Sequence, residues 1–201
     1  ALKDKSDGEL LRLRWLKEMN IQTILDIGAN EGQFALMIRK LLPKAKIYSF
    51  EPIPDCFAKL KMNFKTDSNF EAFNVACGDE GAVIEMNINK FSPSSSFLEI
   101  DELHVQNFRH TANSVKQQIP VKTLDGLSAE LNLVKPYMIK IDTQGYEDKV
   151  IKGGSTLISG AAVVFVELSY RPLYKGQSLF DDIYNKMLHL GFEYHGNTEE
   201  L

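Results

Sequence analysis

The chain has 201 residues, a formal net charge of −4, and a composition that is 44% hydrophobic and 25% charged. These values are ordinary for a soluble globular protein, and we expect one domain over residues 1–201. Lysine and arginine are scattered without a basic stripe, which argues against nucleic acid as a partner, and every apolar run is too short to span a bilayer. Cys56 and Cys77 form no disulfide framework and no metal-ligand spacing, so we expect a reducing, cytoplasmic location.

The first half of the chain alternates strand-like and helix-like segments. Ser6 and Glu9 have the spacing of a capping box ahead of recurring leucines, so we expect a leading helix over residues 6–19. The runs "TILDIGA" and "KIYSFEP" are typical of buried parallel strands, and each precedes apolar residues at helical spacing. We expect "FEAFNVACGDE" to form a third strand followed by a turn, and "AVIEMNI" to form another strand.

Residues 89–119 lose this pattern and form a polar, serine-rich stretch with isolated apolar residues. Connections of this length are uncommon in compact domains, and they are usually lids, substrate loops or disordered segments. We therefore expect an irregular substrate or lid segment over these residues.

Regular patterning returns in the second half. It predicts a strand at "PVKTL", a helix over residues 125–133, a strand at "YMIKID", a helix over residues 145–152 and a strand at "AAVVFVEL". A final helix should begin near Ser178 and close at Gly191, and "FEYH" predicts a last short strand. This alternation is typical of an α/β fold with a doubly wound, mostly parallel sheet and helices on both faces. Such sheets bind ligands at the carboxyl ends of their strands. Those ends carry Asp26, Glu51, Cys77, Asp142 and Glu167.

The glycine turn after the first strand, "DIGANEG", limits the choice of ligand. A dinucleotide-binding turn needs G-x-G-x-x-G, and Asn30 and Gln33 stand where the later glycines would be. Gly28 and Gly32 still let the backbone turn tightly and approach a ligand. Asp26 would repel a pyrophosphate but suits a cationic amine or sulfonium. S-adenosylmethionine carries both groups, and its carboxylate suits the amides at the start of the next helix.

Glu51 ends the second predicted strand, at about the interval at which an acidic residue binds a ribose diol. NAD would use this carboxylate too, so Glu51 alone does not separate the two cofactors. An NAD-type oxidoreductase on a related sheet is the alternative, and Asp26, Asn30 and Gln33 disfavour it. A non-catalytic module that binds S-adenosylmethionine is a third possibility.

Six segments, in this order, resemble the FkbM family of S-adenosylmethionine-dependent methyltransferases: "LDIGANEGQF", "YSFEPIP", "NVACGDEG", "PSSSFLE", "KTLD" and "IKIDTQGYEDKVIKGG". The resemblance implies a class I methyltransferase (Rossmann-like) sheet and O-methylation of a hydroxyl on a sugar, lipid or polyketide-like small molecule. It implies that the methionine end of the cofactor is held by Asp26, Gly28, Asn30 and Gly32, the ribose by Glu51, and the adenine rim by Ala76 and Cys77. Little chain follows "FEYH", so we expect the hairpin that usually ends this fold to be incomplete or supplied differently.

Transfer of a methyl group to an alcohol also requires removal of the hydroxyl proton. Asp142 ends the strand expected nearest the sulfonium, so it is a candidate to contact the methionine portion or the substrate hydroxyl. A helix cap is an equally good interpretation of Asp142. Glu167 is the second candidate base, because a carboxylate after a buried run must be paired, hydrated or functional. We expect no metal between them, since no third ligand is evident.

The acceptor is expected to be a small hydroxylated molecule. The resemblance places the irregular segment near this substrate, so we expect Ser95, Ser96 and His104 to contact it, together with Tyr170 after the fifth predicted strand of the parallel sheet. Ordinary turn or solvent-facing positions are the alternative interpretation of these four residues.

Overall fold

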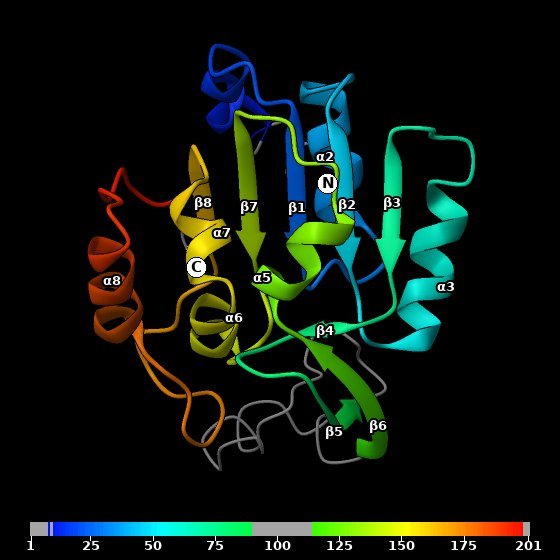
Figure 1. The fold of residues 1–201 in the computed structure, drawn as a ribbon, viewed down its shortest axis with the longest axis vertical. Coiled ribbons are helices and arrows are strands. Elements are labelled where there is room, and N and C mark those ends of the chain that lie inside the picture. The colour runs from blue at the N-terminus through cyan, green and yellow to red at the C-terminus, as the bar shows by residue number, and fades with distance from the viewer. Residues whose placement is uncertain (1–7, 9, 90–113, 199–201) are drawn as a thin grey trace.

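The computed structural model describes residues 8, 10–89 and 114–198 of the chain. Its centre is a five-stranded sheet in which every neighbouring pair of strands is parallel (Figure 1). In order across the sheet, the strands are β3 (Phe70–Phe73), β2 (Lys46–Phe50), β1 (Thr23–Ile27), β7 (Tyr137–Ile141) and β8 (Val163–Val166). The strand order reverses between β1 and β7, and open α/β sheets bind ligands at such a switch point. The expected doubly wound parallel sheet is confirmed.

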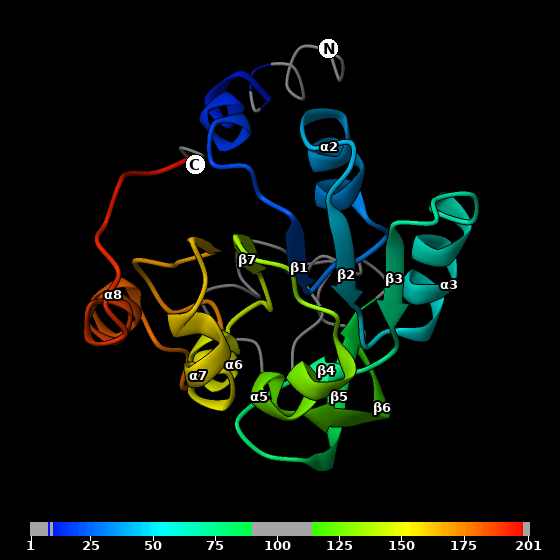
Figure 2. The same cartoon turned by 45° about the horizontal axis from the view of Figure 1, so that its top comes forward.

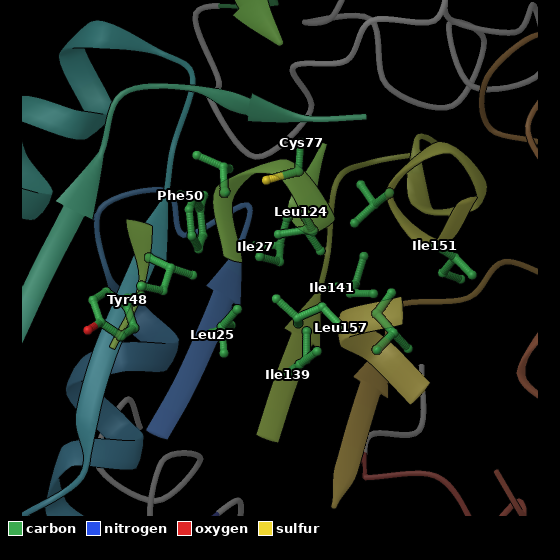
Figure 3. Packing of buried hydrophobic residues seen from close by; sticks show 14 of the residues in the cluster. Leu25, Ile27, Tyr48, Phe50, Cys77, Leu124, Ile139, Ile141, Ile151 and Leu157 are labelled. Carbon is green, nitrogen blue, oxygen red and sulfur yellow. The ribbon is translucent and has the colours of Figure 1, made fainter. Parts of the chain in front are cut away.

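Helices cover both faces of this sheet, because alternate side chains of a strand point to opposite faces. In β1, Leu25 and Ile27 pack with one group of helices and Ile24 packs with the other. The first group is α5 (Leu124–Leu127), α6 (Glu147–Gly153), α7 (Ser155–Ser159) and α8 (Phe180–His189). The second group is the 3-10 turn η1 (Arg14–Lys17), α2 (Gln33–Leu41) and α3 (Pro54–Asn63). Figure 2 shows α2 and the α5–α7 group on opposite sides of the sheet, and Figure 3 shows the core beneath the α5–α7 group.

A second, smaller sheet lies beyond the carboxyl ends of the main strands (Figure 1). Its strands, in the order β4-β6-β5, are β4 (Ala76–Cys77), β6 (Ser114–Lys122) and β5 (Ala82–Asn89). β5 and β6 are antiparallel, and β4 is parallel to β6. Ile119 and Val121 of β6 pack with Ile53, which follows β2, so the small sheet is attached close to the carboxyl end of the main sheet.

Two strand predictions need correction. "FEAFNVACGDE" is not one strand, because Asn74 donates hydrogen bonds to the carbonyl oxygens of Glu51 (2.8 Å) and Pro52 (3.0 Å) and the chain passes there from β3 to the small sheet. The prediction of an irregular segment over residues 89–119 also extends too far at both ends. Asn89 is the last residue of β5, and residues 114–119 belong to β6. Their order comes from pairing with β5, a long-range partner that local periodicity does not show.

Two helix predictions are also too long. The helix expected over residues 125–133 is α5 followed by the short 3-10 helix η4 (Ser128–Glu130). Of the leading helix expected over residues 6–19, the described part has helical residues at 8 and 10–12, a turn at Leu13, and then η1. Short 3-10 turns are common at the ends of α-helices, and sequence periodicity does not separate the two.

The predicted strand "FEYH" is wrong. Residues 192–197 have no strand hydrogen bonding, and Tyr194 packs edge-on against the rings of Phe180 and Tyr184 in α8. Within the described residues, β8 is therefore the last strand of the main sheet. The single-domain boundary stays a prediction.

Cys56 and Cys77 are both buried, and within the described residues neither forms a disulfide bond. Free thiols are common in reducing compartments, and the cytoplasmic location stays a prediction. In the part of the chain that the structure describes, every helix is too short or too polar to cross a membrane.

Candidate active site

The carboxyl ends of β1, β2, β7 and β8 meet at one edge of the sheet, around the switch point. Backbone hydrogen bonding continues past the strand ends there, through the N–H groups of Glu51, Asp142 and Glu167, at 2.8–3.0 Å. Three of the predicted acidic residues therefore start from fixed backbone positions at the same edge. The charge and hydrogen bonding of each side chain decide what this edge can bind.

The turn between β1 and α2 contains three residues in the left-handed backbone region, Gly28 (φ 78°), Asn30 (φ 51°) and Gly32 (φ 94°). This region is costly for residues with a side chain. A Cβ atom on Gly28 would lie 1.8 Å from the carbonyl oxygen of Asp142, and one on Gly32 would lie 2.7 Å from Leu60 Cδ1. Gly28 thus allows the β1 turn to touch the β7 turn, and Gly32 allows the start of α2 to pack on α3.

Glu51, directly after β2, is only 4% exposed, and the backbone holds its carboxylate. Oε2 accepts the N–H of Asn30 at 2.7 Å, and Oε1 accepts the N–H of Ile53 at 2.8 Å. Burial raises the pKa of Glu51 to about 7, against these two hydrogen bonds, which favour the charged form. A carboxylate oxygen has two acceptor sites, so each Glu51 oxygen can accept one more hydrogen bond.

Asp26 lies inside β1, on the sheet face that also carries Ile24, and it is fully buried. Within the described residues, neither of its oxygens meets a hydrogen-bond donor in bonding geometry. Its counter-charge comes from Lys140, which is aligned with it on β7 and whose Nζ lies 3.4 Å from Asp26 Oδ1. Burial raises the pKa of Asp26, although the charge of Lys140 opposes this shift.

Lys140 joins the two turns of the site. Its Nζ lies 3.1 Å from Asp142 Oδ2, donates to the carbonyl oxygen of Gly28 at 3.1 Å, and lies 5.8 Å from the ring centre of Phe34. Burial works to lower the pKa of Lys140, but the charges of Asp26 and Asp142 raise it above its ordinary value. Of the two carboxylates on Lys140, Asp26 has no exposed side-chain surface and Asp142 is 34% exposed.

Asp142 and Glu167 are linked by Gln144. Its Nε2 donates to Asp142 Oδ1 at 3.0 Å and to Glu167 Oε2 at 2.7 Å. Burial, together with the hydrogen bond to Asp142 and the charge of Asp142, raises the pKa of Glu167 to about 9. Burial also disfavours charge on Asp142, but Lys140 and hydrogen bonds from Glu167 and Gln144 lower the pKa of Asp142 below its usual range. The two opposite shifts favour a charged Asp142 and a protonated Glu167.

The turn between β7 and α6 is held by Glu147, which is the first residue of α6. Glu147 Oε1 accepts the N–H of Thr143 at 2.9 Å and that of Gly145 at 3.1 Å. The interpretation of Asp142 as the cap for these amides is therefore wrong, because Glu147 satisfies them. This leaves the Asp142 carboxylate to interact with Lys140 and Gln144.

Residues 26–194 match the family described as the methyltransferase FkbM domain. The chain belongs to this family. It is 29% identical over 165 residues to "2-O-methyltransferase NoeI" of Sinorhizobium fredii, a match that covers 77% of this chain and 66% of the relative. It is 25% identical over 166 residues to "Hexuronic acid methyltransferase AglP" of Haloferax volcanii, covering 82% of this chain and 63% of the relative. The chain thus spans less than two thirds of the length of both relatives.

A solved structure similar to this FkbM chain is the precorrin-6y C5,15-methyltransferase from Geobacter metallireducens GS-15. The two share 14% sequence identity, with a TM-score of 0.46, over 93% of this chain and 68% of the other.

The remaining predicted site residues lie in different surroundings. Ala76 and Cys77 in β4 are buried, and the Cys77 side chain packs beside Leu124 in the main core (Figure 3). Burial raises the pKa of the Cys77 thiol, so this residue is no nucleophile. Tyr170 is 69% exposed, and its ring stacks on Phe180 at 5.0 Å between centres. Ser95, Ser96 and His104 lie outside the described residues. Among the residues that are described, no group of three or more His, Cys, Asp or Glu side chains is placed to hold a metal.

Sequence reasoning missed three residues of this FkbM site: Lys140, Gln144 and Tyr174. The first could have been found, because Lys140 and Asp142 are two apart at a strand end and so share a face, and a lysine within a buried run must be paired. Tyr174 donates its hydroxyl to Gln144 Oε1 at 3.1 Å. That hydrogen bond joins positions thirty residues apart, so no local sequence pattern predicts it.

Proposed function

We propose that the chain is an S-adenosylmethionine-dependent O-methyltransferase that acts on a hydroxyl group of a small, sugar-like molecule. The observation that carries this proposal is Glu51. It is a buried carboxylate at the end of β2, fixed by two backbone N–H groups beside the glycine turn, in a chain of the FkbM family. An acidic side chain at this place in an open α/β sheet suits the two hydroxyls of a ribose.

The residues of the site fit the nucleoside half of this cofactor. Both Glu51 oxygens keep one acceptor site each for the ribose hydroxyls. Asn30, whose N–H fixes Oε2, adopts the left-handed conformation that brings the turn backbone against Glu51. Ala76 and Cys77 turn their side chains into apolar cores, so we assign the adenine rim to the backbone of β4 and not to these side chains.

The methionine half is served by two features of the β1 and β7 turns. Within the described part of the chain, no side chain caps the start of α2, and the first turn of α2 has no acidic residue, so its N–H groups suit a carboxylate. Because Asp26 is fully buried, we assign it an indirect role: it holds Lys140, and Lys140 holds Asp142. The partly exposed Asp142 is then the carboxylate that faces the amino group or the acceptor hydroxyl.

S-adenosylmethionine, when bound, supplies a methyl group on a positively charged sulfur. The acceptor oxygen uses a lone pair to form the new O–C bond, the C–S electrons return to sulfur, and the hydroxyl proton must leave. Asp142, which is ionised beside Lys140, takes this proton. Glu167 already holds a proton, so its role is to hydrogen-bond Asp142 and the acceptor and not to act as a base.

The acceptor is proposed to be sugar-like because the two relatives are named as a 2-O-methyltransferase and a hexuronic acid methyltransferase. Tyr170 stands three residues after Glu167 and presents an exposed ring that Phe180 supports from behind. Aromatic rings provide large, rigid contact surfaces for apolar faces such as the C–H face of a sugar. Ser95, Ser96 and His104 stay predicted acceptor contacts.

Two experiments test this proposal. Calorimetric titration should show micromolar or tighter binding of S-adenosylhomocysteine and no comparable binding of NAD; tight NAD binding would overturn the cofactor assignment. Incubation with methyl-labelled S-adenosylmethionine and a panel of uronic acids and neutral sugars should give a labelled methyl ether. Binding of the cofactor product without labelling of any hydroxylated acceptor would instead favour a non-catalytic binding module.

A further inference from the structure

We infer that Gln144 is a positioning residue that ties the carboxyl groups of Asp142 and Glu167 into one hydrogen-bonded unit, with Tyr174 fixing the orientation of its amide. This inference rests on the proposed function, since it concerns the group that accepts the hydroxyl proton. The pair, the amide and the phenol come from the ends of β7 and β8 and from the loop that follows β8.

Hydrogen bonds to three neighbouring side chains favour one orientation of the Gln144 amide. Its NH₂ group has two hydrogens, which satisfy Asp142 Oδ1 at 3.0 Å and Glu167 Oε2 at 2.7 Å. The hydroxyl of Tyr174 donates to the amide oxygen at 3.1 Å. A flipped amide would point its oxygen at the charged Asp142 carboxylate and would lose both donated hydrogen bonds. Burial and the surrounding carboxyl groups raise the pKa of Tyr174, so its hydroxyl keeps the proton that it donates.

The backbone conformation at Gln144 is an unfavourable one that the surrounding structure maintains. Gln144 has φ 56°, a left-handed conformation that costs a residue with a side chain on the order of 1 kcal/mol. Glu147 compensates locally by accepting the N–H groups of Thr143 and Gly145 on either side. Strain of this kind is retained where a side chain must be aimed, and here it aims the amide between the two carboxyl groups.

Charge around the pair favours one charged and one protonated carboxyl group. Among the described residues, the charged and titratable groups around the pair include Lys140 from β7, Asp26 from β1 through Lys140, Glu147 from α6 and Tyr174 from the loop after β8. The ammonium of Lys140 contacts Asp142 but is already shared with Asp26. Gln144 offers two neutral donors and no charge, so it bridges the pair without forcing both groups to ionise. The oxygens of the pair are therefore held in fixed positions when Asp142 accepts a proton.

The test uses two variants and one control. Gln144→Met removes both donors at nearly constant size, and Tyr174→Phe removes only the hydroxyl that orients the amide. Gln22→Met is the control, since Gln22 precedes β1 at the opposite end of the sheet. Thermal melting establishes that each variant is folded before other measurements. Carboxyl ¹³C NMR titration, assigned with Asp142→Asn and Glu167→Gln, follows the two protonation midpoints without any need for turnover.

We expect Gln144→Met to raise the titration midpoint of Asp142 by about one pH unit, because a hydrogen bond that favours its charged form is lost. The acid limb of kcat against pH should move by the same amount, with kcat about tenfold lower and the affinity for S-adenosylhomocysteine unchanged. Tyr174→Phe should move both limb and midpoint in the same direction by less, and Gln22→Met should move neither. Midpoints unchanged in both site variants would overturn the inference even in a folded, active enzyme. If wild type methylates nothing, the proposed function fails, and the NMR midpoints still decide the role of Gln144.

Discussion

The two halves of the active-site edge hold their carboxyl groups in different ways. On the β2 side, backbone N–H groups hold Glu51, from Asn30 and Ile53. On the β7–β8 side, side chains hold Asp142 and Glu167, from Lys140 and Gln144. A backbone N–H does not ionise and is not removed by an ordinary substitution, whereas a side-chain partner can be replaced and can change its charge. The first arrangement suits recognition of a cofactor group that stays the same in every reaction cycle. The second suits a carboxyl group whose protonation must change during the reaction.

Lys140 lies on the β7–β8 side, but its contacts also reach the turn whose Asn30 N–H holds Glu51. It contacts Asp26 in β1, the Gly28 carbonyl in the turn after it, and Asp142 after β7. A single buried ammonium therefore couples the two halves, and the substitutions below separate its contribution from those of its neighbours.

The largest effect is expected for Lys140→Met, which leaves Asp26 buried without a counter-charge. Removing one partner of a buried ion pair costs about 3–5 kcal/mol of unfolding free energy. Urea unfolding measures this loss, and Lys122→Met, which breaks the exposed pair with Glu130, is the matched control with an expected loss below about 1 kcal/mol. The double variant Asp26→Asn, Lys140→Met should recover part of the loss. Equal stability of Lys140→Met and wild type would show that the pair does not join the two halves.

Asp142→Asn and Glu167→Gln should differ sharply, because the structure gives the two groups different protonation states. Asp142→Asn removes the proton acceptor and should lower kcat about a hundredfold. Glu167→Gln resembles the protonated acid, so kcat at neutral pH should stay within about threefold of wild type. Steady-state rates measured from pH 6 to 10 check both. Similar losses in the two variants at neutral pH would contradict the assignment of the proton to Glu167.

Glu51→Ala should weaken binding of S-adenosylhomocysteine by about 10- to 100-fold, because two charge-assisted hydrogen bonds to the ribose are lost. Glu71→Ala, on the exposed outer strand β3, is the control and should leave affinity unchanged. Calorimetry gives both values. Wild-type affinity in Glu51→Ala would mean that the backbone-held half does not recognise the ribose.

The raised pKa of Glu51 should make both the stability of the protein and its affinity for the cofactor depend on pH. Its pKa rises from 4.5 to about 7 on folding, so the ligand-free protein loses stability as pH rises through this window. Cofactor affinity should show the opposite trend and strengthen between pH 6 and 8, because the ionised carboxylate is the better acceptor. Glu51→Gln should flatten both curves. A wild-type affinity that is constant over this range would count against Glu51 as the ribose ligand.

The smallest effect is expected at Tyr170. Tyr170→Ala should raise KM for the acceptor about fivefold and leave kcat unchanged, since it removes a stacking surface worth about 1 kcal/mol. Tyr170→Phe keeps the ring and serves as the matched control. An unchanged KM in Tyr170→Ala would remove this residue from the acceptor site.

Much of the fold followed from local pattern. Buried runs flanked by helical periodicity located the five parallel strands, and because parallel strands end at one edge, Glu51, Asp142 and Glu167 were expected near one another. The glycine turn was also predicted from the sequence. The structure gives the reason for its first glycine, because a side chain at Gly28 would collide with the Asp142 carbonyl oxygen.

Contacts between residues that are distant in the sequence were harder to predict. Residues 114–119 pair with β5 across a long connection, and "FEYH" alternates like a strand but packs on α8. The ion pair of Asp26 with Lys140 joins two strands that are distant in sequence, and the indirect role of Asp26 stays a proposal. The orientation of Gln144 depends on Tyr174, and only the folded chain brings these two together.

The most direct test is a crystal structure of the protein with S-adenosylhomocysteine. We predict that the ribose hydroxyls donate to Oε1 and Oε2 of Glu51 and that the homocysteine end lies beside Asp142, with Asp26 still buried under its ion pair with Lys140. A complex in which Glu51 contacts anything other than ribose, or in which the ligand occupies another part of the fold, would contradict the account.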